Sequence, residues 1–463
     1  MLRLTSPQRD FWDDLLPPEA RIMSRQLAAI DALLDDERFM APFRARFRSK
    51  RGRYTIPMET YLRLMYLKTK YQLGYETLVS EVTDSVSWRR FCRISLSGRV
   101  PDASTLIKLT NGPCKGLAEQ VHDALVKKLT EKKVLRGRKV RVDTTVVEAD
   151  IHYPTDVDLL ADGVRVVTRT VKQLQQTGVE TGGKFRNVGR SVKKRLLALG
   201  KGLKQDDEEK KQATRASVTA EVLAITERVV RRAKAAQEQV IQWVEQQGER
   251  VPKRITCRVR QLATWLERTE RVIAQTKQVL GGDRHVKNRL VSLFDPDARP
   301  IKKGNLRRPT EFGFKVVVTD EDHGFVTDYE VFIGNPGDTT VLVPAIERHA
   351  KRVGTAPKEI ATDRGMARPT NEKALLKLGL ERCSLPKTGP KTAAEQAKER
   401  SRWFRRLQRF RAGGEGRISL LKRRYGWRHS RLRGLDGVKT WIGWGAITHN
   451  LAKYGQMQAA KVA

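Results

Sequence analysis

The spacing of hydrophobic residues changes several times along this chain. Before residue 134, apolar positions recur every three or four residues, as in LAAIDALLDD and METYLRLMYLK, which predicts helices. In KVRVDTTVVEAD (139–150), apolar and polar residues alternate and β-branched residues dominate, which predicts a strand. Helical spacing returns over 165–290, and strand patterns resume near residue 310. The pattern therefore predicts an α/β protein whose first strand is separated from the others by a long helical segment.

Short helices joined by turns characterise the N-terminal part of the chain. Between Ile56 and Asn111, four short segments of helical spacing are separated by turns that include Gly74 and Pro101. This predicts a compact all-α domain, which we place at residues 1–135. A helix-turn-helix-like domain that reads DNA and a helical bundle that supports dimerisation fit this pattern equally well.

The predicted strand carries a carboxylate, Asp143, on the polar side of its alternation. Further acids follow at Asp150, Asp156, Asp158 and Asp162, so charge alone does not select a metal ligand. We choose Asp143 because a strand holds a side chain rigidly enough to position a metal ion.

Two long helices are predicted within a basic insertion at residues 165–295. They span 217–247 and 258–280, with apolar residues at three- and four-residue steps and charged surfaces, as in a helical hairpin or coiled coil. The insertion could clamp DNA, support dimerisation or act as a spacer, and the sequence does not choose among these roles.

Strand patterns then alternate with helical ones to the end of the chain. Segments 314–320 and 325–333 flank a turn at 322–324 and predict a hairpin. A helix, a short strand that ends at Asp363 in ATDRG, a helix and a further strand follow. A carboxylate at the carboxyl end of a strand, before a glycine loop, is typical of functional sites in α/β folds.

The last part of the chain contains an arginine-rich helix and an apolar closing helix. Residues 398–433 hold fourteen Lys or Arg side chains but only two acids, Glu399 and Glu415. On a helix, Arg411, Glu415 and Lys422 share one face. Glu415 could form a simple helical ion pair, worth about 0.3–0.5 kcal/mol, or could bind a metal ion on a surface that faces phosphates.

The order of these elements matches an RNase H-like catalytic domain, with one strand, a hairpin, and then helices and strands in alternation. We therefore predict an α/β protein with an RNase H-like mixed sheet, an N-terminal all-α domain and a helical insertion after the first catalytic strand. The two parts of the catalytic domain are placed at 136–164 and 296–463. In this arrangement the first and fourth strands are neighbours, so Asp143, Asp363 and Glu415 can converge and hold two divalent cations.

Charge points to a polyanionic partner. The 463 residues include 91 Lys and Arg against 53 Asp and Glu, a net charge of +38. No stretch approaches 18 consecutive apolar residues, and the N-terminus lacks the apolar core of a signal peptide, so we expect a cytosolic protein that binds nucleic acid, without membrane association.

The cysteines and histidines exclude some metal sites. The four cysteines, Cys92, Cys114, Cys257 and Cys383, are too scattered for a zinc ribbon or a disulfide framework, and we expect them to be reduced and structural. The seven histidines do not cluster. A catalytic metal would therefore take oxygen ligands, which favours Mg²⁺ or Mn²⁺.

Several of these motifs together resemble the DDE transposases of bacterial insertion sequences. The resemblance covers most of the chain except the insertion. It includes DTTVVEADIHYPTDVDLLADG, PTEFGFKV, ATDRG, the tail GLDGVKTWIGWGAITHNL and residues 56–111. The family signature Tyr-x2-Arg-x3-Glu-x6-Lys falls on Arg411, Glu415 and Lys422.

The resemblance implies an enzyme that cleaves the ends of a transposable element and joins them to target DNA with two Mg²⁺ or Mn²⁺ ions per site. Asp143, Asp363 and Glu415 would be the catalytic metal ligands. The DNA-binding residues would be Arg364, Arg411 and Lys422. The expected partner is double-stranded DNA, as terminal inverted repeats and target, bound by a homodimer in a bacterial cytoplasm, in association with the nucleoid. An RNase H-fold nuclease or resolvase without joining activity and a catalytically dead DNA-binding regulator are the alternatives.

Two departures from the family pattern affect this interpretation. Gln408 stands where the signature has tyrosine, so a role for that hydroxyl is not expected here. Gly413, Gly414 and Gly416 surround Glu415, and each glycine inside a helix costs about 1 kcal/mol relative to alanine. Either the helix begins near Glu415, or the glycines admit close approach of the DNA backbone.

Overall fold

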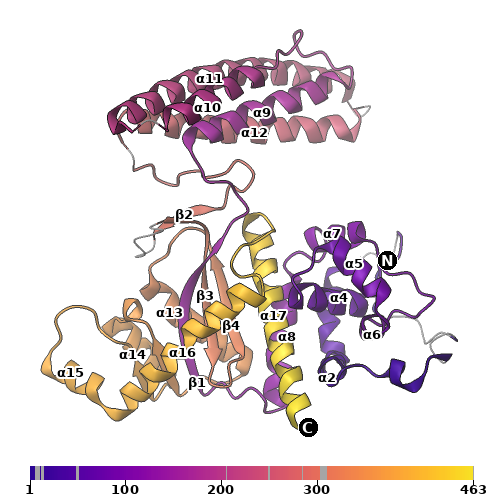
Figure 1. Cartoon of the computed structure of the whole chain (residues 1–463), viewed down its shortest axis with the longest axis vertical. Coiled ribbons are helices and arrows are strands. Elements are labelled where there is room, and N and C mark those ends of the chain that lie inside the picture. Colours follow the sequence, from indigo (N-terminus) through magenta and orange to yellow (C-terminus); the bar gives the residue numbers. More distant parts are fainter. Residues whose placement is uncertain are drawn as a thin grey trace. The chain divides into compact units, whose positions relative to one another are not determined.

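The computed structural model describes residues 1–5, 11, 15–47, 52–204, 206–248, 251–283, 285–302 and 310–461. Its contacts divide the chain into two compact units (Figure 1), one formed by Met1–Asp150 and Ile301–Ala463 and the other by Ile151–Pro300. The sequence pattern places the start of the insertion at residue 165. The second unit begins earlier because Asp156–Gln175 forms one helix, α9, whose first turn is capped by the Thr155 hydroxyl.

The N-terminal part of the first unit is helical, as its apolar spacing predicts. The helices begin and end at η1 Pro18–Arg21, α2 Arg25–Leu34, η2 Glu37–Phe39, α3 Ala41–Arg46, α4 Met58–Lys70, α5 Tyr75–Asp84, α6 Val86–Phe91, α7 Ala103–Asn111 and α8 Leu117–Glu131. Helix α4 is buried from Met58 to Lys68, which makes it the central helix of this region. Hydroxyl groups of Ser24 and Ser85 cap α2 and α6.

A mixed sheet forms the centre of the first unit. Its strands are β1 Lys139–Glu148, β2 Arg299–Lys302, β3 Thr310–Glu321, β4 Val326–Phe332, β5 Glu359–Thr362 and β6 Arg382–Ser384. The order is β2-β3-β1-β5-β6, with β4 paired to β3. Strand β1 runs antiparallel to β3 and parallel to β5, and β5 runs parallel to β6. The predicted hairpin is confirmed by the antiparallel pairing of β3 with β4.

The helices of the sheet region are α13 Asp338–Val353, η4 Arg364–Met366, α14 Pro369–Lys377, α15 Ala393–Arg400, α16 Arg402–Arg424 and α17 Gly434–Lys461. Val140 and Val142 of β1 pack in one apolar cluster with residues of α13, β3 and β5. The alternate residues of β1, Arg141 and Asp143, therefore face the opposite side, where α16 lies. The alternation of β1 thus separates an apolar face from a polar one that carries Arg141 and Asp143.

Helix α17 joins the sheet to the N-terminal helices. It contacts α2, α4 and α8 on one side and β4 on the other (Figure 1). The Asn450 side chain, which is fully buried, accepts from Val326 N–H at 2.9 Å and donates to Val326 O at 2.8 Å. The closing helix is therefore fixed to the edge strand by a complete pair of hydrogen bonds.

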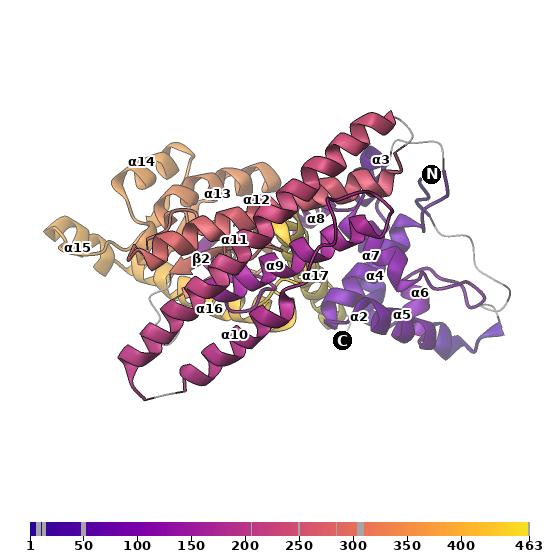
Figure 2. The ribbon, with the colours of Figure 1, turned by 90° about the horizontal axis from the view of Figure 1, so that it is seen from above.

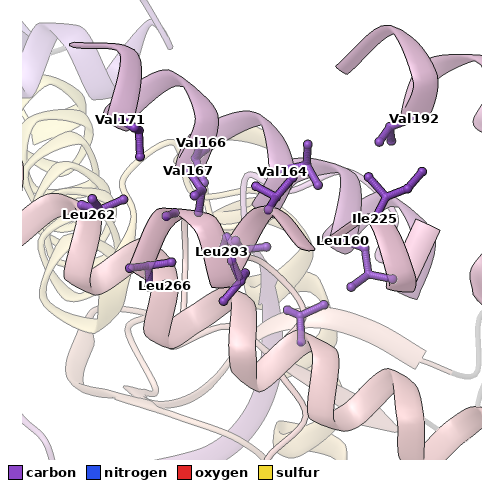
Figure 3. Packing of buried hydrophobic residues seen from close by; sticks show 14 of the residues in the cluster. Leu160, Val164, Val166, Val167, Val171, Val192, Ile225, Leu262, Leu266 and Leu293 are labelled. Carbon is purple, nitrogen blue, oxygen red and sulfur yellow. The ribbon is translucent and has the colours of Figure 1, made fainter. Parts of the chain in front are cut away.

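The second unit is built from helices α9, α10 Gly189–Gly202, α11 Glu208–Gln247 and α12 Lys253–Leu280, which run beside one another (Figures 1 and 2). Valine, leucine and isoleucine at helical spacing make its core. Figure 3 shows Val167 and Val171 of α9 beside Leu262 and Leu266 of α12, and Leu160 of α9 near Ile225 of α11. None of the described helices of either unit is long and apolar enough to span a membrane.

Candidate active site

Asp143 and Asp363 come together because two parallel strands are in register. Val142 of β1 pairs with Thr362 of β5, so the next residue on each strand is a carboxylate. Asp143 Oδ1 accepts from Thr144 N–H at 2.7 Å. Asp363 Oδ1 accepts from Arg364 N–H at 2.8 Å and caps the short helix η4. Residues that are far apart in sequence are therefore placed side by side, as the predicted adjacency of the first and fourth strands requires.

The third predicted ligand, Glu415, lies on α16 with Arg411 one turn before it. The Arg411 guanidinium approaches all three predicted ligands, Nη2 at 3.8 Å from Asp143 Oδ2 and 3.5 Å from Asp363 Oδ2, and Nη1 at 3.4 Å from Glu415 Oε1. The simple helical ion pair considered from the sequence is thus present, but it is part of a larger cluster. Arg411 is the common partner of the three carboxylates.

The three carboxylates differ in their exposure to solvent. The Asp143 side chain is 17% exposed, Asp363 56% and Glu415 73%, so the cluster opens outward from the sheet. The Arg411 Nε is buried and has no hydrogen-bond partner among the described residues. One buried and two accessible carboxylates around a single cation form an oxygen donor set that fits a hard divalent cation such as Mg²⁺ or Mn²⁺.

Burial sets the protonation of Asp143. Removal from water raises the pKa of Asp143 to about 6, and the nearby carboxylates of Asp363 and Asp320 act in the same direction. The Thr144 N–H and the Arg411 guanidinium oppose this rise in the pKa. A raised carboxyl pKa beside further carboxylates is typical of sites that bind cations.

Helix α16 is continuous from Arg402 to Arg424, so the expectation that a helix begins near Glu415 is wrong. The glycines allow another side chain to approach instead. A Cβ on Gly413 would lie 2.9 Å from Arg141 Nη1, and one on Gly414 would lie 3.3 Å from Arg141 Cδ. Apart from its chain neighbours and the backbone of α16 itself, no described residue lies within 4 Å of a Cβ on Gly416. Arg141 of β1 therefore takes the space beside Gly413 and Gly414 where the sequence suggested DNA.

Arg141 and Asp320 form a buried support that the sequence analysis did not identify. The two residues face each other on β1 and β3, and the guanidinium donates to both carboxylate oxygens of Asp320 at 2.7 and 2.6 Å. Arg141 Nη1 also donates to Phe410 O at 2.7 Å. A single side chain thus ties α16 to the strand that carries Asp143. The only sequence feature that pointed to this role is that Arg141 lies on the same face of the predicted strand as Asp143.

Gln408 has a structural function at the position of the signature tyrosine. Its side-chain amide donates to Ser384 Oγ at 2.8 Å and to Ser384 O at 3.2 Å, and it lies 3.5 Å from Thr362 O. These contacts connect α16 to the ends of β6 and β5. They hold the helix next to the residue that precedes Asp363.

The remaining predicted residues lie at the margin of the carboxylate cluster. Arg364 is exposed beside Asp363, and its backbone N–H rather than its guanidinium bonds to that carboxylate. Lys422 lies on α16 two turns beyond Glu415, where it lines a cavity with Tyr425.

A different set of side chains brings its possible metal-ligand atoms close together. Among the described residues, only Glu321, Asp322 and His323 form a set of three possible ligands whose donor atoms all lie within 4.8 Å of one another. They are consecutive residues of the β3–β4 turn, beside the start of β1, where Asp322 N–H donates to Lys139 O. Burial raises the pKa of Glu321 to about 8, which disfavours its charged form.

Comparison with known families gives two matches. A family model described as "Transposase domain (DUF772)" matches residues 11–111, and one described as "Transposase DDE domain" matches residues 288–451. Together they cover more than half of the chain. The second match contains Asp363, Arg411, Glu415 and Lys422, whereas Asp143 lies outside both. No curated protein and no solved structure matches the chain.

Proposed function

The chain belongs to the DDE-type transposases of insertion sequences, and from this premise we propose that it cleaves the ends of a transposable element and joins them to target DNA. The convergence of Asp143, Asp363 and Glu415 on the Arg411 guanidinium is the observation that carries the proposal. Clustered carboxylates have no use in a protein of net charge +38 that only binds DNA, because they repel phosphates.

The strand order supports an RNase H-like interpretation of the sheet. Apart from β2, the strands lie in the order β4-β3-β1-β5-β6. Of the two neighbours of β1, β3 runs antiparallel to it and β5 runs parallel to it. Asp143 lies within β1 directly after its last pair with β5, Asp363 follows the end of β5, and Glu415 lies on the neighbouring helix α16. We propose this arrangement as the catalytic core.

Asp143, Asp363 and Glu415 are proposed to hold two Mg²⁺ or Mn²⁺ ions. When bound, such ions activate a water or a 3′-hydroxyl and stabilise the leaving oxygen in phosphoryl transfer. The residues of the chain supply the fixed geometry. Strand β1 and the Arg141–Asp320 pair hold Asp143 and α16, and Arg411 neutralises the carboxylates until cations replace its charge.

Arg364, Arg411 and Lys422 are proposed to bind phosphates of the element's terminal inverted repeats or of target DNA. Arg411 lies among the three carboxylates, Arg364 follows Asp363 in η4, and Lys422 lies two turns beyond Glu415 on α16. Because two element ends must be joined together, we propose a homodimer in the DNA complex. A DNA substrate also favours association with the bacterial nucleoid in the cytoplasm.

A strand-transfer assay tests the function. Purified protein, a labelled duplex that carries the element end and a plasmid target are incubated with Mg²⁺, Mn²⁺ or EDTA. Joined product that requires the metal is expected, and Asp143→Asn and Glu415→Gln should each reduce it by about a thousandfold or more, as the loss of a group essential to the chemistry does. Glu347→Gln, an exposed change on α13, is the matched control.

The assay also separates the alternatives. Cleavage without joining would replace the transposase by an RNase H-fold nuclease or resolvase. Metal-independent DNA binding without cleavage would replace it by a DNA-binding regulator. Full activity of Asp143→Asn would remove Asp143 from the set of metal ligands.

A further inference from the structure

A cavity of about 780 Å³ lies within the helical unit, between α9 and α10. One face of α9 lines it through Arg165, Thr168, Arg169 and Lys172, and α10 contributes residues that include Lys193. All of its lining residues belong to this unit, so the cavity shares no residue with the carboxylate cluster. The volume is within the range of sites for small organic ligands, about 300–1,000 Å³.

Two buried side chains of the cavity wall leave a polar atom without a hydrogen-bond partner. Thr168 is 4% exposed, and its hydroxyl bonds to no described residue, whereas the Thr170 hydroxyl donates to Val166 O at 2.8 Å. Asp162 is 9% exposed, and its Oδ1 accepts from Arg165 while its Oδ2 has no partner in the described part of the chain. Buried polar atoms are normally paired, so these two atoms point to a ligand that completes their hydrogen bonding.

Three cations around the Thr168 hydroxyl have no acidic partner. Arg169 follows Thr168, Lys172 lies one turn beyond it on the same face of α9, and Lys193 lines the cavity from α10. All three are exposed, and none forms an ion pair with a described residue. A hydroxyl donor together with several cations that lack counter-charges is an arrangement that binds phosphate groups.

The other end of the α9 wall is acidic. Asp158 and Asp162 line the cavity about two to three turns before Thr168. One oxygen of Asp158 accepts from the Thr155 hydroxyl at 2.5 Å, and Asp162 Oδ2 lies 3.8 Å from His152 Nε2, which is beyond hydrogen-bond distance. These carboxylates would repel a phosphate and would accept hydrogen bonds from hydroxyl or amino groups. The cavity therefore fits a ligand with phosphate at one end and hydrogen-bond donors at the other.

Apolar side chains form another part of the wall. They are Val164 of α9 and Val192 and Leu196 of α10. Such a surface suits the flat face of a nucleobase, whereas a sugar phosphate or an inorganic anion would leave it in contact with water. Duplex DNA does not suit this site, because the cavity lies between two packed helices and its acidic end would repel the phosphate backbone.

We propose that this cavity binds a nucleoside di- or triphosphate. Its phosphates lie at the Thr168 hydroxyl and the three unpaired cations, and its ribose hydroxyls or base amino group donate to Asp158 and Asp162. The helical insertion is then a binding unit for a small ligand rather than a spacer. The inference does not depend on the proposed function, because no residue of the carboxylate cluster lines the cavity.

Isothermal titration calorimetry with ATP tests the proposal without catalysis. The full chain is titrated in EDTA, so that no divalent cation can hold a nucleotide at the carboxylate cluster, and at about 0.15 M salt, which screens general attraction to the net charge. We expect saturable binding of one ATP per chain. AMP should bind about tenfold more weakly or worse, because it lacks two of the phosphates that the cations contact. Tripolyphosphate should also bind about tenfold more weakly than ATP, because it leaves the apolar wall uncovered.

Three variants locate the binding and keep the test independent of folding. Thr168→Val replaces the hydroxyl by a methyl group and should weaken ATP binding about tenfold. Its thermal unfolding midpoint without ATP should stay the same or rise, because the unpartnered hydroxyl gives the free protein no hydrogen bond. Arg169→Met should also weaken binding about tenfold or more. Arg231→Met, an exposed change on α11 outside the cavity, is the charge-matched control and should bind as the wild type does.

Several results would overturn the proposal. Absence of saturable ATP binding, or unchanged affinity in Thr168→Val, would remove the site. Equal weakening in Arg231→Met and Arg169→Met would show that general charge explains the binding. Tripolyphosphate that binds as tightly as ATP would remove the nucleoside from the assignment, and full displacement of ATP by a short duplex would make the cavity a DNA contact. None of these measurements requires strand transfer, so failure of this inference leaves the proposed function standing.

Discussion

The two units bury polar side chains in different ways. In the helical unit, buried hydroxyls of Thr226, Thr269 and Thr276 each donate to the carbonyl four residues earlier on their own helix. In the sheet unit, buried polar groups find partners far away in sequence, as Arg141 does with Asp320 across 179 residues and His349 with Gly137 across 212. Local pairing supports a scaffold, whereas distant pairing fixes the geometry of a site.

The apolar cores of the two units also differ. The core of the helical unit is a cluster rich in valine, leucine and isoleucine, most of it contributed by α9, α10, α11 and α12. In the sheet unit, the apolar cluster that contains Val140 and Val142 lies on the α13 side of β1, and on the other side Arg141 pairs with Asp320. Substitutions can therefore test the stability that apolar packing provides separately from the stability that paired charges provide.

The largest effect is expected where a buried charge loses its partner. Arg141→Met leaves Asp320, whose side chain is 4% exposed, with the longer contact to Arg417 at 3.3 Å. Breaking such a pair costs about 3–5 kcal/mol. Hydrogen exchange read by mass spectrometry should show lost protection in the sheet unit and unchanged protection in the helical unit.

A second substitution sharpens this result. Arg141→Met combined with Asp320→Leu removes both charges and should recover most of the stability, because apolar replacement of a buried ion pair is often neutral. Strand transfer should stay low, since the link from Arg141 to Phe410 O is lost. A double variant as unstable as the single one would show that packing, not charge, is what Arg141 supplies.

A core truncation should affect the helical unit by a comparable or smaller amount. Leu266→Ala removes a side chain that is 3% exposed and should cost about 3 kcal/mol through the lost contacts and the cavity left behind. Leu197→Ala on α10, where the side chain is 61% exposed, is the control and should change little. Loss of protection at β1 in Leu266→Ala would mean that the units do not unfold separately.

The raised pKa of Asp143 predicts that pH affects the stability of the sheet unit alone. The folded-state pKa of about 6 lies above the ordinary value of 3.8, so the folded protein holds the proton more tightly. The stability that this provides is complete below pH 3.8 and is lost as the pH rises through about 6. In EDTA, the free energy of unfolding of Asp143→Asn, relative to that of the wild type, should therefore rise by about 2–3 kcal/mol between pH 4 and pH 7. A constant difference between them across this range would contradict the raised pKa.

The smallest expected effect distinguishes two glycines of α16. Gly416→Ala should stabilise the protein by about 0.5–1 kcal/mol, because alanine favours the helix and nothing lies within 4 Å of the new Cβ. Gly413→Ala should lose this gain, because its Cβ would meet Arg141 Nη1 at 2.9 Å. Thermal unfolding of the two variants gives the comparison. Equal stabilisation would show that Arg141 moves away at no cost.

Much of the local structure was available from the sequence. The alternation of KVRVD predicted β1, and the paired β patterns around residues 322–324 predicted the hairpin of β3 and β4. The helical spacing of 217–247 and 258–280 predicted most of α11 and α12, although α9 and α10 were not predicted. These features depend on periodicities of two or about 3.6 residues, which neighbouring residues reveal directly.

The sequence therefore determined most of the elements, the basic character of the chain and the residue types from which a metal and DNA site could be assembled. Only the tertiary structure decided that Arg411 lies among all three carboxylates, that Arg141 fills the space beside Gly413 and Gly414, and that Gln408 ties α16 to β5 and β6. The physical reason is that these contacts join residues separated by tens to hundreds of positions. Strand register and the close approach of a helix to a sheet fix such contacts, and neither leaves a local pattern in the chain.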